Sequence, residues 1–229
     1  MKTILLFFTL SFVSVINAQN NCSQFYLTKK GTKATIHHYN QKDKLTSKTT
    51  YQVIDINSSG SDTKITMGLS MKEGKKDKVI TEAQFDITCD GGTTHLDPQS
   101  IISPKILDQY KEMEYTIEGD NISIPNSLSV GQKLKDGHIA MAINAGVISL
   151  DIKIDIADRK VEAKETITTS AGSFDCYVIS YTNNMNMSMG VSHTYHIREW
   201  IAKEVGMVQQ ETKKTNGKLV GKSILQQLN

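Results

Sequence analysis

The sequence predicts a mainly β protein: a large, curved antiparallel sheet, shaped as a half-barrel or barrel, with one short helix. Apolar and polar residues alternate along most of the chain, most strictly from Ile65 to Met71, which is typical of strands with one buried face. Turn signals separate these segments, and helical spacing occurs from Pro104 to Met113. About ten to twelve strands joined by short turns must curl or be covered to protect their apolar face.

Residues 1–18 fit a secretory signal peptide. Lys2 supplies the positive charge, Ile4 to Ile16 form a short apolar core, and Ala18 offers a small residue for cleavage. The mature protein would begin at Gln19 and be exported, to the periplasm or the exterior. Because the apolar core is too short for a permanent span, we expect no transmembrane segment after signal removal. No linker divides residues 19–229, which should form a single β-rich domain.

The expected strands follow one another between turn signals. Early segments around Lys30-Gly31 read as two short strands, and the residues around Gly119-Asp120-Asn121 read as a hairpin. The helix is predicted by Ser103 as a cap, Pro104 at the first position and apolar residues at helical spacing. The remaining strands are expected near Tyr51–Ile56, Val79–Cys89, Ile139–Ile156, Val161–Thr168, Phe174–Met189, Val191–Ala202, Val205–Lys213 and Leu219–Leu228.

The composition argues against a nucleic-acid partner. Lys and Arg number 26 against 24 Asp and Glu, and the cations are scattered rather than clustered. A nucleic-acid partner is therefore not expected, because such surfaces need a basic patch.

Three cysteines lie in what should be an oxidising compartment, where a disulfide is expected and one thiol is left over. Spacing alone leaves three pairings open. We favour Cys22 with Cys89, because Cys176 lies in an apolar strand and free cysteine often acts as a small buried hydrophobe.

A metal site is not expected from the histidines. His37 and His38 are adjacent, and His193 and His196 are three apart, so in each pair the side chains point to opposite faces of a regular strand. No Cys or carboxylate completes a zinc spacing near them.

Met185, Met187 and Met189 place three thioethers on one strand face. Such a stripe packs a core, lines an adaptable ligand pocket, or binds Cu(I) through soft sulfur. We take the three methionines as candidate pocket residues. Trp200 is read as a core anchor, with a role in the ligand pocket as the alternative.

Catalytic signatures are not found. Cys176 is the one nucleophile with histidines in the same region, and its strand pattern buries it. No nucleophile elbow, zinc-protease motif, P-loop or dinucleotide fingerprint occurs. We therefore predict a protein that is not an enzyme and has no cofactor.

An ordered set of short phrases in the C-terminal half resembles the TapB-like family of exported bacterial proteins. The phrases are Ile124-Pro125, Leu128, Val130-Gly131, Leu134, Asp136-Gly137, Arg159 to Glu162, Lys164-Glu165, Ala171 to Tyr177, Trp200 to Ala202, Val205 to Val208 and Glu211. Ser170 and Glu204 depart from the family pattern at turn positions. The resemblance implies a curved sheet with a helix, similar to LolA/LolB-type lipoprotein carriers, and implies no established activity.

Two functions remain open. The first is an exported, non-enzymatic binding protein that holds a lipid or other apolar molecule inside the curved sheet. The alternative is an envelope or secreted interaction protein with a packed interior and a protein partner. An enclosed apolar cavity of about 300 Å³ or more would favour the first.

Overall fold

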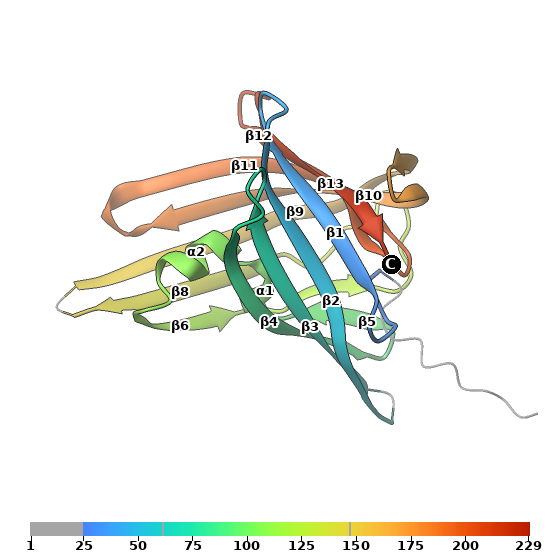
Figure 1. Cartoon of the computed structure of the whole chain (residues 1–229), viewed down its shortest axis with the longest axis horizontal. Coiled ribbons are helices and arrows are strands. Elements are labelled where there is room, and N and C mark those ends of the chain that lie inside the picture. The colour runs from blue at the N-terminus through green and yellow to red at the C-terminus, as the bar shows by residue number, and fades with distance from the viewer. Residues whose placement is uncertain (1–24, 61, 147) are drawn as a thin grey trace, which may run out of the picture.

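The computed structural model describes residues 25–60, 62–146 and 148–229, and its strands form one curved antiparallel sheet (Figure 1). The predicted signal peptide and Cys22 lie outside these residues. The sheet has 13 strands in the order β6-β8-β9-β10-β11-β12-β13-β1-β2-β3-β4-β5-β7, slightly more than expected. Most strands pair with their neighbours in the chain, so local turns build most of the sheet.

The strands are β1 (Lys33–Asn40), β2 (Leu45–Ser59), β3 (Asp62–Glu73), β4 (Val79–Asp90), β5 (Thr93–Leu96), β6 (Glu114–Gly119), β7 (Ile122–Pro125), β8 (Gly137–Ala145), β9 (Ile148–Thr169), β10 (Gly172–Met187), β11 (Val191–Ala202), β12 (Gly206–Lys214) and β13 (Leu219–Leu228). A short 3-10 turn, η1 (Ser188–Gly190), joins β10 to β11. Two expectations about strand bounds were wrong. The segment before Lys30-Gly31 is not a strand, and the strands expected around Ile154 and Val161 are one long strand, β9.

The hairpin predicted around Asp120-Asn121 was also wrong. β6 pairs with β8 and β7 pairs with β5, at opposite ends of the sheet. Because only these two residues join β6 to β7, the two edges of the sheet meet here without pairing. A close contact joins the two ends: a Cβ on Gly137 of β8 would collide with the Ile122 side chain of β7.

Two short helices, rather than the one predicted, lie between β5 and β6. They are α1 (Pro98–Ile101) and α2 (Pro104–Gln109), and both contact β4 while α1 also contacts β6. The α1 turn is capped by Asp97, whose carboxylate accepts a hydrogen bond from the Gln99 amide at 2.7 Å. Ser103 precedes α2 but makes no side-chain cap. Ile102 and Leu107 are buried, so the helices close apolar surface between the two ends of the sheet.

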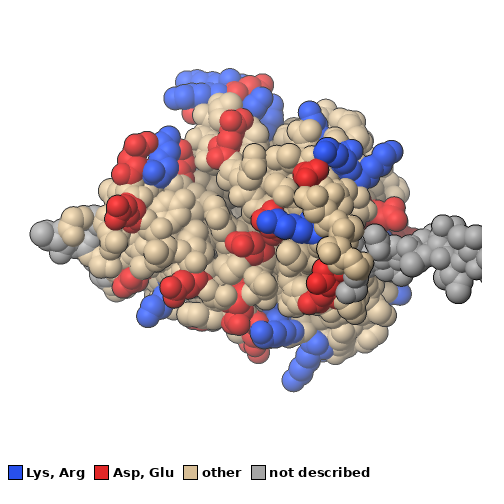
Figure 2. Space-filling view, turned by 90° about the horizontal axis from the view of Figure 1, so that it is seen from below, with Lys and Arg blue, Asp and Glu red and all other residues tan. Residues whose placement is uncertain are grey.

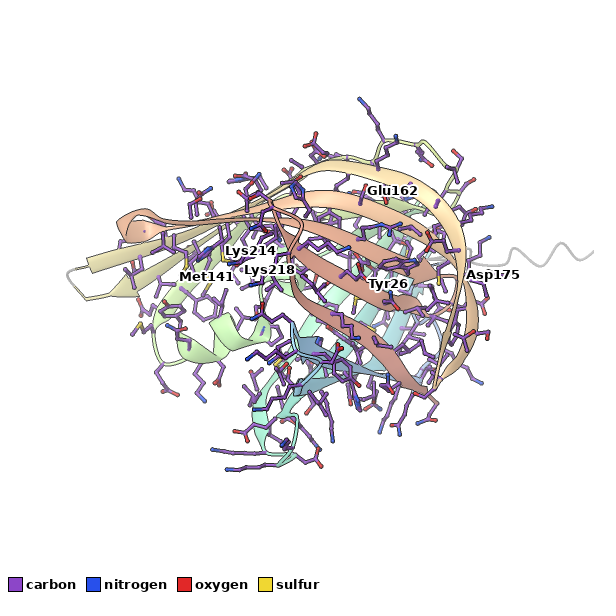
Figure 3. All side chains as sticks on the ribbon, turned by 90° about the horizontal axis from the view of Figure 1, so that it is seen from above. Tyr26, Met141, Glu162, Asp175, Lys214 and Lys218 are labelled. Carbon is purple, nitrogen blue, oxygen red and sulfur yellow. The ribbon has the colours of Figure 1, made fainter. Side chains whose placement is uncertain are left out.

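The core follows the alternation of the strands. On β3 the four predicted residues Ile65 to Met71 are buried at every second position. Curvature is strongest where β9 and β10 turn back, around the region that carries the Asp175 label in Figure 3. On the face shown in Figure 2, cationic and anionic side chains are interspersed rather than grouped by sign. The curled sheet therefore encloses apolar surface and exposes a mixed-charge exterior.

Candidate ligand-binding cavity

A cavity of about 390 Å³ lies inside the curled sheet. Its lining comes from strands at both ends of the sheet and from α1, so it exists because the sheet curls. Apolar side chains supply most of the lining: Leu27, Ala34, Ile36, Met67, Phe85, Ile87, Leu96, Ile101, Ile122, Ile124, Ile156, Ile179, Ile197, Val205 and Met207. A volume above about 300 Å³ is in the range of small-molecule sites.

Ionisable and phenolic side chains also face this cavity. They are Arg159 of β9, Glu199 of β11, Tyr181 of β10, Tyr51 of β2, Tyr26, which precedes β1, and His38 of β1, whose ring nitrogens are hydrogen-bonded to Ser223 and Thr49. Tyr26 lies within the strongly curved half of the sheet in Figure 3. Charged groups this deep in a protein are uncommon unless they are paired or functional. The cavity therefore combines an apolar wall with a small polar centre.

A bulge in β9 turns Arg159 inward. Ile152, Ile154 and Ile156 are buried at alternate positions, and regular alternation would next place Asp158 on that face. The pairing with β10 instead shifts its register between Ser180 and Thr182, and Asp158 has a φ of 58°. An extra residue of this kind re-aims the side chains that follow it.

The Arg159 guanidinium links β9 to the other end of the sheet. Its Nη1 donates hydrogen bonds to the carbonyl oxygens of Ser123 at 3.1 Å and Lys135 at 2.5 Å, and its backbone amide donates to Asp136 at 3.2 Å. Only 4% of the residue is exposed. Burial lowers the pKa of Arg159, and the nearby Glu199 opposes that change, yet a guanidinium remains charged in proteins.

Glu199 occupies an inward position between Ile197 and Ile201. Burial raises the pKa of its carboxyl above the ordinary 4.5, while the charge of Arg159 and a hydrogen bond from Tyr181 act in the opposite direction. The Tyr181 hydroxyl donates to Oε2 of Glu199 at 3.4 Å, a long contact. The carboxyl therefore faces the cavity with weak local support.

The phenols around Glu199 are neutral hydrogen-bonding groups. Burial, followed by the charge of Glu199, raises the pKa of Tyr51 to about 12. Burial likewise raises the pKa of Tyr26 and of Tyr181. Each hydroxyl thus keeps its proton at physiological pH and can donate it to an acceptor in the cavity.

Asn183 adds an unsatisfied acceptor. Its Oδ1 is buried and has no hydrogen-bond partner among the described residues, and the side chain lines the cavity. A buried polar atom without a partner is costly, and such atoms are few in folded proteins. Oδ1 of Asn183 therefore lacks a donor, which a bound water or a protonated group in the cavity would supply.

The predicted pocket residues lie elsewhere. Met185 and Met187 are partly buried on β10, beyond Asn183 toward η1, and pack against the hydrophobic core. The lining formed by the described residues includes neither of them, nor Trp200. The expected stripe of three methionines on one strand was wrong, because β10 ends at Met187 and Met189 lies in η1; the side chain of Met189 lies outside the described ones. A ligand contact by the methionines or the tryptophan stays a prediction.

Trp200 is 3% exposed and points to the face of β11 opposite Glu199. Its Nε1 donates to Oε2 of Glu165 at 2.7 Å, and the Arg198 guanidinium lies 4.9 Å from the centre of the indole ring. This geometry satisfies the polar end of the indole within the protein.

Cys89 is disulfide-bonded and Cys176 is free and buried. Cys22 lies outside the described residues, so the Cys22–Cys89 pairing stays a prediction. Burial raises the pKa of the Cys176 thiol to about 11.

Residues 25–60, 62–146 and 148–229 lack two kinds of feature. No group of three or more His, Cys, Asp or Glu side chains in this part is placed to hold a metal ion. No helix of the same part is long and apolar enough to cross a membrane.

The curled sheet around an apolar cavity defines a class of β-rich proteins with an interior site. Within that class, residues 29–225 match the DUF3108-like family, and the chain belongs to this family. No curated protein matches the chain.

Two crystal structures share the fold. One is a candidate exported protein with a YmcC-like fold from Bacteroides fragilis, at 20% identity and a TM-score of 0.74, covering 91% of this chain and 100% of that one. The other is a candidate lipoprotein from Parabacteroides distasonis, at 22% identity and a TM-score of 0.77, covering 91% and 99%. These comparisons do not confirm the predicted resemblance to the TapB-like family or to LolA/LolB-type carriers.

Proposed function

We propose that this protein is an exported, non-enzymatic binding protein that holds an apolar molecule or lipid in the cavity of its curved sheet. The observation that carries the proposal is the cavity of about 390 Å³ with its mostly aliphatic and aromatic wall. Removing an apolar group from water into such a wall is favourable, and sites of this kind are usually formed before the ligand arrives.

Export is supported by two independent features. The sequence begins with a stretch that fits a secretory leader, and both structural neighbours are described as a candidate exported protein or lipoprotein. The site of residence, periplasm or exterior, is left open in the proposal.

A binding role is favoured over catalysis by the chemistry of the described side chains. Cys176 is a poor nucleophile because burial raises its pKa. Glu199 has Tyr181 as its hydrogen-bonding neighbour, which is a partner suited to recognition and not a nucleophile paired with an oriented base.

The size of the cavity limits the size of the proposed ligand. At about 390 Å³ the cavity is near the lower end of the range of about 300–1,000 Å³ for small-ligand pockets. We therefore propose a single small apolar or amphiphilic molecule as the ligand.

The experiment is native mass spectrometry of the mature protein purified from its own envelope fraction, followed by organic extraction of any bound molecule. The matched pair of variants is Ala34→Phe, which fills the cavity, and Ala142→Phe, which adds the same ring on the opposite face of β8 from buried Met141 and Ile143. A stoichiometric apolar passenger in the wild type and in Ala142→Phe, but not in Ala34→Phe, is the expected result.

An empty wild type that also takes up no alkyl ligand added in excess would contradict the proposal. The alternative, an envelope or secreted interaction protein with a packed interior, would then be preferred.

A further inference from the structure

We propose that the ligand of this cavity is an amphiphile with an anionic head, a carboxylate or a phosphate, and that Arg159 receives that head while the alkyl part lies against the aliphatic wall. This inference rests on the proposed function and names the ligand class of the same site. It comes from the donors that the polar centre of the cavity leaves open.

The guanidinium of Arg159 uses only part of its hydrogen-bonding capacity within the described residues. Nη1 makes both side-chain hydrogen bonds of the residue, to the carbonyls of Ser123 and Lys135. No described residue accepts a hydrogen bond from Nε or Nη2. A guanidinium has five N–H donors in a planar fork that matches carboxylate and phosphate oxygens. The carbonyl contacts hold the group in place, and Arg159 lines the cavity.

The neighbouring groups favour an acceptor at this point. The hydroxyls of Tyr26 and Tyr51 line the cavity, and no hydrogen bond joins either of them to another described residue. Both are neutral donors from separate parts of the chain, one ahead of β1 and one in β2. One fixed positive charge and two open phenols make a set of donors suited to an anion.

Glu199 is the one carboxyl in the cavity lining, and it does not cancel this preference. Burial disfavours its charged form and raises its pKa, and Tyr181 already donates to it. In its neutral form the carboxyl can itself donate a hydrogen bond to the head of a ligand.

The apolar wall decides between a free anion and an amphiphile. Ile36, Ile87, Ile124 and Phe85 line the same cavity. A free inorganic anion would leave this wall in contact with water, whereas an alkyl chain would cover it. The site therefore fits a molecule with both parts.

The test is calorimetric titration of the delipidated mature protein with four twelve-carbon probes, each below its aggregation threshold: dodecanoate, dodecyl phosphate, dodecanol and dodecylamine. Inorganic phosphate is titrated alone to separate a free anion from a lipid head. Wild type is compared with Arg159→Met and with Arg198→Met, which removes an arginine from the opposite face of the sheet. Circular dichroism checks the fold of each variant.

We expect the wild type and Arg198→Met to bind both anionic probes about tenfold or more tightly than dodecanol, since hydrogen bonds to a charged group are strong. Arg159→Met should bind dodecanol as before and lose this preference. Inorganic phosphate should bind far more weakly than dodecyl phosphate.

Arg159 also joins two ends of the sheet, so two gentler variants keep the test valid if Arg159→Met fails to fold. Arg159→Lys keeps the charge without the fork, and Tyr26→Phe removes one hydroxyl. Each should reduce the preference for the anionic probes by about threefold or more.

Four results would overturn the ligand class. They are equal affinity of the wild type for dodecanol and dodecanoate, tighter binding of dodecylamine, equal binding of inorganic and dodecyl phosphate, or an unchanged preference in both Arg159→Lys and Tyr26→Phe. The binding function would survive the first, second and fourth of these results. Failure of every alkyl probe to bind would instead contradict the proposed function itself.

Discussion

Two clusters on opposite faces of the same strand, β11, contain nearly the same side chains and differ in how completely they are bonded. One consists of Arg198, Trp200, Glu162 and Glu165. Arg198 donates to Glu162 at 2.9 Å and to Glu165 at 3.3 Å, and the indole donates to Glu165 at 2.7 Å. The donors and acceptors of this cluster form hydrogen bonds with one another, and we call it the saturated cluster.

The other cluster, around Glu199 and Arg159, faces the cavity and contains polar groups without hydrogen-bond partners among the described residues. We call it the open cluster. Its Glu199–Tyr181 contact is long at 3.4 Å, and the acceptor of Asn183 is buried without a partner among the described residues. An arginine, a glutamate and aromatic rings thus stabilise the fold where their hydrogen bonds are complete. Where the bonds are incomplete and a cavity adjoins them, they indicate a binding site.

The largest expected effect is on stability, in the saturated cluster. Trp200→Ala should lower the free energy of unfolding by about 3–5 kcal/mol, because it removes a buried indole and leaves a cavity. Urea denaturation measures this loss. The preference of the folded variant for dodecanoate over dodecanol should not change, and a loss below about 1 kcal/mol would show that Trp200 is not a core anchor.

A pH-dependent effect is expected in the open cluster. The pKa of Glu199 is raised by burial, so the unfolded chain releases this proton at a lower pH than the folded protein. As pH rises above the ordinary 4.5, folding loses stability until Glu199 ionises in the folded state too. Glu199→Gln removes the titration, so its stability relative to wild type should increase with pH.

Urea denaturation of both proteins at about pH 4 and about pH 8 measures this difference. Glu165→Gln is the matched control on the opposite face, and its difference from wild type should not increase in the same way. A Glu199→Gln difference that stays constant or falls with pH would contradict the raised pKa.

A smaller effect is expected for the arginine of the saturated cluster. Arg198 is about one-third exposed, with 38% of its side chain accessible. Arg198→Met should therefore cost about 1 kcal/mol or less, since exposed ion pairs contribute little. Thermal unfolding at low and high salt measures the loss, and a cost close to that of Trp200→Ala would mean that the cluster is far more coupled than its exposure indicates.

The smallest expected effect is on a reaction rate rather than on stability. Burial raises the pKa of Cys176 to about 11, so the thiol should be alkylated by iodoacetamide slowly in the folded protein and quickly in denaturant. Mass spectrometry of the time course tests this. Rapid modification of folded protein would place Cys176 in an open position and would weaken the argument against a nucleophilic role.

Local patterns predicted most of the fold. Strict alternation at Ile65 to Met71 gives the buried face of β3, and the spacing after Pro104 gives α2. The same reasoning failed around Asp120-Asn121, because a turn signal shows that the chain changes direction but not which strands pair. The four residues of α1 are too few to show a helical period.

The candidate site was harder to predict, and for two different reasons. Glu199 could have been found, because a charged residue between Ile197 and Ile201 occupies an inward position of a strand. Arg159 could not, because the bulge at Asp158 reverses the alternation that predicts its direction. The methionine pattern predicted pocket residues on β10 beyond Asn183. The cavity of the structure forms only when strands distant in the sequence curl together, which a local pattern does not show.

The most direct test of the central claim is a crystal structure of the mature protein with 12-bromododecanoate, in which anomalous scattering locates the end of the alkyl chain. We expect bromine among the aliphatic side chains of the cavity, near Ile36 and Ile87, with the carboxylate beside Arg159. Bromine on the exterior of the sheet, or an empty cavity at saturating ligand, would contradict it.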